Sequence, residues 1–295
     1  MDSKKWLKLS EKEQAELLDS YRMTFDYHTH TVFSHGKGTI EDNVKVAVSK
    51  GLDGIAISDH GPGHLTYGLD VGKIPEMKKE IQRLATAYPQ IKILLGVEAN
   101  TVMREPFVDI SAEESREFDF VMAGYHYGVR KSQTVSNYLH RKLGVSWHST
   151  ADLLVKNTDM IIRALYESEE RGIHIFALTH PGDKGPFDIE DIAKVCSDTG
   201  TYLEINNSHR NLSTEGIMIS SEFDVKYIIG SDAHVPQKVG EYKDALSRAF
   251  EAGLDLSRIV NIEKKVKRGG VYREQKMEMR DGSNYYHRSI GIRKE

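Results

Sequence analysis

The sequence has few of the features that define several whole classes of protein. One cysteine in 295 residues, Cys196, excludes an intramolecular disulfide framework and suits a reducing compartment. Only 7 prolines and 24 glycines, with 39% hydrophobic residues, exclude a collagenous or disordered chain. No apolar run approaches the roughly 20 residues of a transmembrane helix, and the N-terminal residues are too polar for a secretory signal peptide. The sequence therefore predicts a cytoplasmic globular protein with no membrane segment.

Charge is unevenly distributed along the chain. Residues 261–295 hold 10 Lys and Arg against 5 Asp and Glu, so the net charge of −4 divides into +5 on this tail and −9 on the body. Nucleic-acid-binding domains usually carry a basic footprint. We therefore do not expect the acidic body to bind nucleic acid, although the basic tail leaves nucleic acid open as a partner. An acidic body with a basic tail also permits an oligomer.

Short apolar runs typical of buried strands alternate with helical stretches. The strand-like runs are 23–27, 54–58, 92–97, 119–124, 174–179, 201–206 and 226–230. The helical stretches, where apolar residues recur every three or four positions, are 40–51, 73–88, 150–171, 189–200 and 241–252. This alternation predicts βαβ units around a parallel sheet, which closes into a barrel or forms a doubly wound sheet.

Three further segments flank or interrupt this pattern. Residues 1–22 predict an N-terminal helix packed on the main domain, with the capping-box spacing of Ser10 and Glu13 near its middle. Residues 23–260 form the main domain. Within it, 127–149 lacks periodicity and is predicted to be an inserted loop, and loops of that length are often functional. Residues 261–295 are predicted to be a basic C-terminal extension.

Side chains able to bind a metal ion, or to hydrogen-bond near one, follow every predicted strand. They are His28, His30, His35, Asp59, His60, Glu98, His126, His180, Asn206, Asn207, Asp232 and His234. The carboxyl ends of parallel strands meet at one edge of the sheet, so we expect these side chains to lie together. Imidazole and carboxylate donors without thiolate suit Zn²⁺, Mn²⁺ or Fe. Seven His, one Glu and one Asp exceed the four ligands of a single tetrahedral site, which predicts two or three metal ions.

Each of these residues alone has a simpler interpretation. A His-x-His pair is often a packing or surface feature, Asp59 suits the N-cap of a turn, and His126 suits a buried core position. The joint pattern at seven strand ends carries the prediction of a multinuclear site.

Seven motifs occur in an order that resembles one known family. They are DYHTHTVFSHG, ISDHGPG, LLGVEAN, AGYHYG, LTHPGD, LEINNS and GSDAH. They resemble the PHP (polymerase and histidinol phosphatase) family, above all its YcdX-type branch of stand-alone phosphatases. The resemblance implies a distorted, TIM-like (β/α)7 barrel of parallel strands, with three divalent metal ions at the C-terminal strand ends, zinc or manganese in the first place and Fe as an alternative.

The same resemblance implies a set of metal ligands. One ion would bind His28, His30, Glu98 and Asp232; a second would bind His35, His60 and His234; Glu98 would bridge to a third, completed by His126 and His180.

The expected activity is hydrolysis of a small phosphomonoester by a metal-bound hydroxide, because divalent ions lower the pKa of water and neutralise phosphoryl oxygens. His60 and Asp232 are the catalytic candidates, with Asp59 orienting His60. The substrate-binding candidates are His64, Arg130, Lys131, Asn206, His209 and Arg210.

Three other functions compete with this one. A histidinol-phosphate phosphatase would share the chemistry, but no imidazole-alcohol pocket is identifiable from the sequence. A nuclease or phosphodiesterase would use the basic tail and show a strong salt dependence. A non-catalytic metal-binding module is disfavoured by the intact set of ligands.

Overall fold

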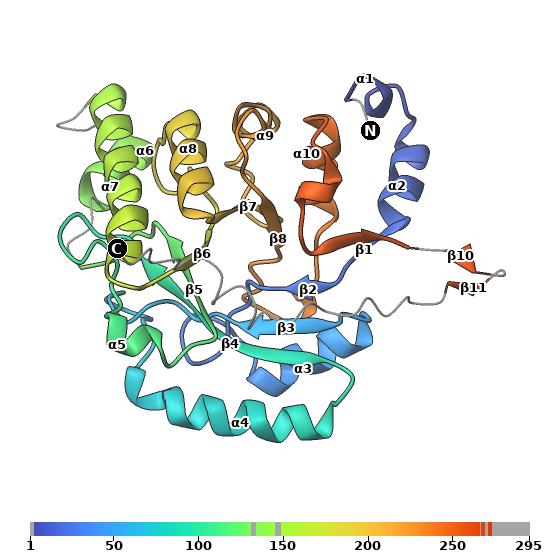
Figure 1. Cartoon of the computed structure of the whole chain (residues 1–295), viewed down its shortest axis with the longest axis horizontal. Coiled ribbons are helices and arrows are strands. Elements are labelled where there is room, and N and C mark those ends of the chain that lie inside the picture. The colour runs from blue at the N-terminus through green and yellow to red at the C-terminus, as the bar shows by residue number, and fades with distance from the viewer. Residues whose placement is uncertain (1–2, 131–133, 145–148, 266, 269–270, 273–295) are drawn as a thin grey trace, which may run out of the picture. The chain divides into compact units, whose positions relative to one another are not determined.

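A sheet of seven parallel strands, hydrogen-bonded in chain order from β2 to β8, lies at the centre of the computed structural model (Figure 1). The strands are β2 (Phe25–Asp26), β3 (Gly54–Ile57), β4 (Lys92–Asn100), β5 (Phe120–Gly124), β6 (Ile175–Leu178), β7 (Tyr202–Asn206) and β8 (Tyr227–Gly230). Each overlaps a predicted strand, and each neighbouring pair is parallel. The structure describes residues 3–130, 134–144, 149–265, 267–268 and 271–272.

The first and last strands of this sheet approach each other and nearly close it into a barrel. Thr29 and Ala233, just beyond β2 and β8, form an isolated parallel bridge. The buried Asn261 spans the seam: its Nδ2 donates to the carbonyl oxygens of Phe25 (2.8 Å) and Ile229 (2.7 Å), and its Oδ1 accepts from the Ile229 N–H. The distorted (β/α)7 barrel is therefore confirmed, with side-chain hydrogen bonds at its seam.

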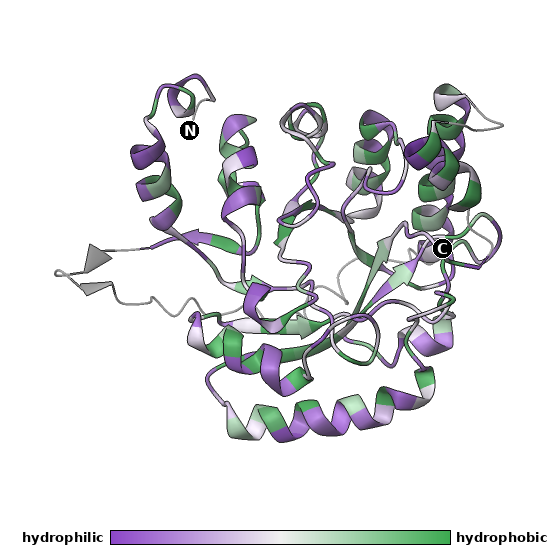
Figure 2. Ribbon diagram, turned by 180° about the vertical axis from the view of Figure 1, so that it is seen from behind, coloured by the Kyte–Doolittle hydropathy of each residue, from purple (hydrophilic) through white to green (hydrophobic). Residues whose placement is uncertain are grey.

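Helices follow most strands and cover the outside of the sheet (Figure 1). The longer ones are α3 (Ile40–Ser49), α4 (Ile74–Ala87), α7 (Thr150–Glu170), α8 (Ile189–Thr199), α9 (Thr214–Ser221) and α10 (Lys243–Glu251), and α5 (Ala112–Ser115) is a single turn. Three 3₁₀ turns, η1 (Val71–Lys73), η2 (Pro236–Lys238) and η3 (Leu256–Arg258), complete the connections. Figure 2 shows green, apolar strands inside helices that carry both apolar and polar residues, as expected for helices packed on one face.

Local sequence signals set the ends of several helices. Thr39 and Ser149 form capping boxes with residues three positions on, which satisfies free backbone N–H groups at the starts of α3 and α7. Asp188 caps α8, and Gly200 ends that helix with a left-handed backbone (φ 73°).

The N-terminal segment differs from its prediction. Instead of one helix it forms α1 (Ser3–Trp6), α2 (Glu11–Asp19) and the short strand β1 (Tyr21–Met23), which pairs with β9 (Ile262–Lys264). The capping box of Ser10 and Glu13 starts a new helix rather than lying within one. The buried Trp6 ring stacks on Phe250 of α10 at 4.8 Å between centroids, so α1 packs on the barrel.

The segment predicted to be an inserted loop, 127–149, contains a helix, α6 (Thr134–Leu143). Its apolar residues Val135 and Leu143 are more than 60% exposed, so they contribute little to holding the helix in place. The buried Asn137 holds α6 instead, through reciprocal amide hydrogen bonds of 2.9 Å with Asn157 of α7.

Residues 1–263 form one compact unit, and 264–295 form a second. In the second, β10 (Lys267–Arg268) and β11 (Val271–Tyr272) pair antiparallel. Most of the predicted basic extension, from 273 onward, lies outside the described residues. Among the helices in the described ranges, none has the length and apolar character of a membrane span.

Candidate metal centre

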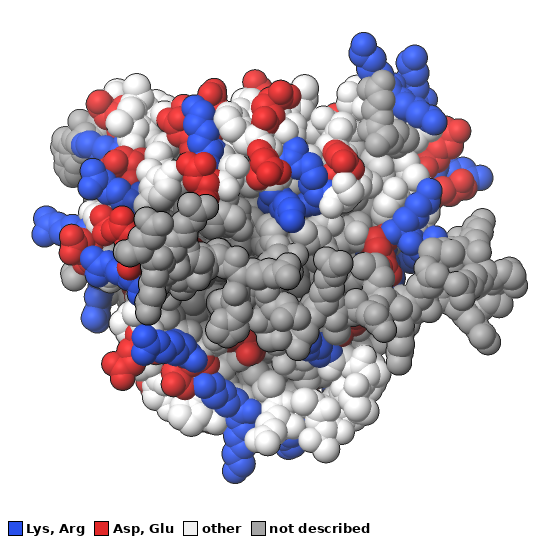
Figure 3. All heavy atoms as spheres, in the orientation of Figure 1, with Lys and Arg blue, Asp and Glu red and all other residues white. Residues whose placement is uncertain are grey.

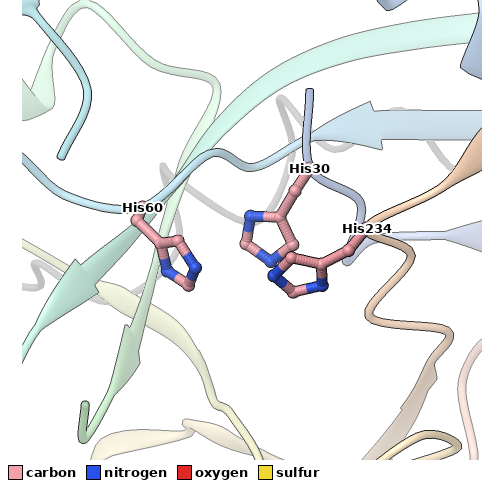
Figure 4. Close-up of side chains that lie close together, drawn as sticks. All are labelled: His30, His60 and His234. Carbon is pink, nitrogen blue, oxygen red and sulfur yellow. The ribbon is translucent and has the colours of Figure 1, made fainter. Parts of the chain in front are cut away.

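Histidines from distant parts of the chain meet at the carboxyl edge of the sheet. His30 follows β2, His60 follows β3 and His234 follows β8. Figure 4 shows their rings turned toward one another. The His30 ring centroid lies 4.3 Å from those of both His60 and His234. Strands far apart in sequence therefore place imidazoles within reach of common ions.

Glu98, fully buried in β4, lies among the imidazole rings of five histidines. Its Oε1 is 2.9 Å from His180 Nε2 and 3.4 Å from His126 Nε2. The same oxygen is 3.4 Å from His28 Nε2. Its Oε2 is 2.9 Å from His60 Nδ1. Both carboxylate oxygens of Glu98 therefore face ring nitrogens, as a bridging ligand requires.

Asp232, after β8, provides the second buried carboxylate. Its Oδ1 lies 3.2 Å from His30 Nε2, 3.3 Å from His234 Nδ1 and 3.6 Å from His28 Nε2. This oxygen therefore faces His28 and His30, which follow β2, and His234, which follows β8, the two strands that meet at the seam.

Four groups of side chains in the described residues have ligand atoms within 4.8 Å of one another. They are His30–His60–His234, His28–His30–Asp232, His28–Glu98–His180 and His60–Glu98–His126. His60 Nδ1 and Glu98 Oε2 fit a metal because both are buried and 2.9 Å apart, yet neither has a hydrogen-bond partner. The Nε2 atoms of His126 and His180 also face each other at 3.2 Å. Donors arranged in this way fit divalent ions.

Polar residues behind the rings fix the direction in which the rings point. Glu204 Oε1 lies 2.7 Å from His28 Nδ1, and Asn100 Oδ1 lies 2.8 Å from His126 Nδ1. These contacts leave each Nε2 free to face the centre, which is how metal-binding imidazoles are usually oriented. Thr179 Oγ1 donates to Glu98 Oε1 at 2.6 Å.

The electrostatics of the site favour ionised carboxylates but act in both directions on the imidazoles. Burial raises the pKa values of Glu98 and Asp232, but surrounding histidines outweigh it and lower both well below the usual range. Burial lowers the pKa of His126 to about 3, and burial with neighbouring His60 lowers that of His30. Burial also lowers the pKa values of His28 and His180, but the neighbouring carboxylates outweigh it and raise both. Ionised carboxylates and neutral imidazoles are the metal-binding species.

The backbone also shows the constraints of this site. His180 (φ 27°) and Asp232 (φ 53°) adopt left-handed conformations that are uncommon for residues other than glycine. Such conformations cost on the order of 1–3 kcal/mol and cluster at functional sites. At Gly230, a Cβ would lie 1.9 Å from Glu204 Oε1, so only glycine leaves room for this carboxylate behind His28.

Comparison with known proteins identifies the family. The PHP domain matches residues 26–208, more than half of the chain. The chain belongs to the PHP domain family. A probable phosphatase of Thermoanaerobacter sp. strain X514 is 30% identical over 82% of this chain and 91% of its own length. A probable phosphatase of Shewanella sp. strain MR-4 is 29% identical over 75% and 81% of the two chains.

A solved structure shares the PHP fold. It is the histidinol phosphate phosphatase of Lactococcus lactis subsp. lactis, complexed with zinc, L-histidinol and phosphate; it is 19% identical, with a TM-score of 0.54 over 79% of this chain and 95% of that one. The family, the curated relatives and the His/Glu clusters together identify a metal-dependent PHP-type phosphatase that hydrolyses phosphate esters.

Most predicted ligands come together in this PHP site. The four groups contain His28, His30, His60, Glu98, His126, His180, Asp232 and His234. His35 belongs to none of these groups of described residues: it is exposed, its ring stacks on Tyr67 at 4.2 Å, and it lies 4.9 Å from the His234 ring. It is therefore at the rim, and its role as a ligand stays a prediction.

Two predicted substrate-binding residues are buried and have hydrogen-bond partners within the protein. His64 is buried, its Nε2 donates to the Tyr127 carbonyl oxygen at 2.7 Å, and its Nδ1 accepts from the Thr66 N–H. Asn206 is also buried, and its Nδ2 donates to Glu204 and Asp232. Their roles in substrate binding stay predictions.

The remaining candidates lie at different depths of the site. Arg130 is exposed on the loop after β5, and Lys131 lies outside the described residues. Arg210 is exposed, with its Nε 3.7 Å from Asp244 Oδ2 of α10. His209 lies within the site, 3.3 Å from Asp232 Oδ2.

Asp59 does not have the partner that we expected. Its carboxylate accepts from the Thr31 N–H (2.7 Å) and Oγ1 (2.6 Å) and from Ser34 Oγ (2.5 Å). It therefore holds the turn that leads to His35, rather than orienting the His60 ring.

Sequence reasoning missed three residues, Glu204, Asn100 and Asp183. The first two had a signal, since Asn100 lies two positions after Glu98 and Glu204 two before Asn206, on the same strand faces. Asp183 lies on the loop after β6, where no periodicity in the sequence predicts the position of a side chain.

Proposed function

We propose that this chain hydrolyses small phosphomonoesters at a site that binds three divalent metal ions, Zn²⁺ or Mn²⁺. The observation that supports it is the sharing of Glu98 between two ligand groups, one with His28 and His180 and the other with His60 and His126. Because Asp232 and His234 extend the cluster further, the ligand atoms exceed the requirement of a single tetrahedral ion.

In this proposal, each ion has its own combination of ligands. His28, His30, Glu98 and Asp232 would hold one ion; His35, His60 and His234 would hold the second; Glu98, His126 and His180 would hold the third. When bound, divalent ions supply a low-pKa water and neutralise phosphoryl oxygens. The protein residues keep the ligand nitrogens correctly turned, through Glu204 behind His28 and Asn100 behind His126.

The surface is consistent with a small substrate. On the face seen in Figure 3, the coloured Lys and Arg side chains alternate with Asp and Glu, without an extended basic field. The footprint of a nucleic-acid-binding protein would be predominantly basic.

Phosphate release from a panel of phosphomonoesters tests this function. The panel contains nucleotides, sugar phosphates and histidinol phosphate, the last because the similar solved structure holds L-histidinol and phosphate. The protein is loaded with Zn²⁺ or Mn²⁺, and a parallel sample is treated with chelator. We expect release that chelator abolishes and about three ions per chain by elemental analysis. Diester cleavage without monoester cleavage, or one ion per fully active chain, would contradict the proposal.

Asp232→Ala provides the matched test of the site. It removes the carboxylate whose Oδ1 faces three histidines, and we expect it to lower both bound metal and hydrolysis. The control is Glu117→Gln, on the surface beside Lys78, which should change neither.

A further inference from the structure

His209 lies between two carboxylates at the edge of the metal centre. Its Nδ1 is 3.2 Å from Asp183 Oδ1, and its Nε2 is 3.3 Å from Asp232 Oδ2. Its side chain is 34% exposed, whereas both carboxylate groups are almost completely buried. The His209 ring thus connects Asp183, which belongs to none of the four ligand groups of the described residues, to Asp232, which belongs to one of them.

Asp183 is held firmly enough to serve as an anchor. It lies on the loop after β6, where its backbone N–H donates to the His180 carbonyl oxygen. Lys184 Nζ contacts its Oδ2, and Arg141 Nη1 of α6 lies 3.6 Å from its Oδ1. Burial raises the pKa of Asp183, but His209, His180 and Lys184 outweigh it and lower that pKa. Basic groups from three segments of the chain therefore face this carboxylate and hold it in place.

The two oxygens of Asp232 have separate partners. Oδ1 faces His30 Nε2 at 3.2 Å, on the side of the ligand groups. Oδ2 faces His209 Nε2 at 3.3 Å and accepts from Asn206 Nδ2 at 3.2 Å. Contacts to Oδ2 therefore set the rotation of the carboxylate, and so the direction of Oδ1. The left-handed backbone of Asp232 makes such support more important, since the residue is not in its preferred conformation.

We propose that His209 is a positioning residue: anchored by Asp183, it donates from Nε2 to Asp232 Oδ2 and holds Oδ1 toward the metal ions. This role rests on the metal binding of the proposed function and replaces the expectation that His209 binds substrate. Groups that orient metal ligands typically change metal affinity 10–100-fold when removed.

Two substitutions at the same position separate the two contacts. The amide nitrogen of Gln reaches the position of imidazole Nε2, whereas that of Asn reaches the position of Nδ1. His209→Gln therefore keeps the contact with Asp232 and loses that with Asp183, and His209→Asn does the reverse. The control is His174→Gln, at the opposite end of β6, where the ring pairs with the surface residue Glu169.

The measurements are titration of the metal-free protein with Zn²⁺ against a chromophoric chelator, and the visible spectrum of the Co²⁺-loaded protein. We expect His209→Asn to weaken the tightest affected site about 10–100-fold and to alter the Co²⁺ bands. His209→Gln should lie between wild type and His209→Asn, because it keeps the contact with Asp232 but loses the anchor, and His174→Gln should match wild type. Wild-type affinity and spectrum in His209→Asn, or equal losses in the Asn and Gln variants, would overturn this role while leaving the proposed function intact. A wild-type chain that binds no Zn²⁺ would instead overturn the proposed function and this role with it.

Discussion

Replacing Glu204 by Gln tests whether a buried carboxylate sets the metal-binding tautomer of His28. Oε1 lies 2.7 Å from His28 Nδ1, while Oε2 accepts from the His180 N–H at 2.8 Å and from Asn206 Nδ2 at 2.9 Å. The amide oxygen of Gln must take the Oε2 position, because two donors face it. Its NH₂ group then faces His28 Nδ1, which must become an acceptor. The ring proton moves to Nε2, and that nitrogen can no longer bind a metal ion.

The size of the effect follows from these contacts. The substitution exchanges one charge-assisted hydrogen bond, worth about 1.5–3 kcal/mol, for a neutral one with the opposite donor direction. Loss of a partner behind a metal-binding imidazole costs about 10–100-fold in metal affinity, which equals about 1.4–2.8 kcal/mol. The two magnitudes agree, so we expect a loss of one to two decades in Zn²⁺ affinity with the fold retained.

Competition between the metal-free variant and a chromophoric chelator measures this affinity directly. Circular dichroism and urea unfolding show whether Glu204→Gln remains folded, and Glu117→Gln on the surface is the matched control. A folded Glu204→Gln protein with wild-type Zn²⁺ affinity would refute the reasoning, because His28 would then bind without its tautomer being set by Glu204.

Three further predictions concern other parts of the barrel. Gly124→Ala would place a Cβ 2.5 Å from Thr179 Oγ1 and 2.8 Å from Glu98 Oε1, so we expect about 1–3 kcal/mol of destabilisation in urea and weaker metal binding; a neutral effect would show that Glu98 can shift freely. Cys196 is 1% exposed and burial raises its pKa, so it should react with a thiol reagent only after denaturation, and prompt labelling of the folded protein would contradict this. Burial raises the pKa of Asp109 to about 6, so its protonated form favours the folded state: its contribution is present at low pH and is lost as pH rises through about 6, a change of about 3 kcal/mol. Urea unfolding from about pH 4 to about pH 7 should show a flatter pH dependence in Asp109→Asn, and identical slopes would exclude this linkage.

The sequence predicted the strands well because the strands of this barrel are buried on both faces. Residues such as Ile55, Ile57 and Ile229 have no exposed surface, so each strand is a continuous apolar run. Helix α9 was missed because Ile217 is buried while Met218 beside it is 50% exposed, which leaves no clear apolar stripe.

The site was predictable as far as the strand ends determine it. Metal-binding side chains after parallel strands must meet, whatever their rotamers, and His126 and His180 do so. The direction in which a side chain on a loop points depends on its contacts with other loops. His64 contacts the Tyr127 carbonyl oxygen, and Asp59 contacts Thr31. No periodicity in the sequence predicts either contact.

The hydrogen bonds of Asn261 tie the timing of site assembly to a late part of the chain. Phe25 and Ile229, which Asn261 joins, lie a few residues before His28 and Asp232. During synthesis from the N-terminus, every residue with a ligand atom in the four groups leaves the ribosome before the residue that fastens the two edges. The nascent barrel should therefore bind metal most tightly once residue 261 has emerged and adds its hydrogen bonds to the Thr29–Ala233 bridge. A chain that stops at residue 258 should bind Zn²⁺ far more weakly than the full chain, and equal binding would show that the seam closes without Asn261.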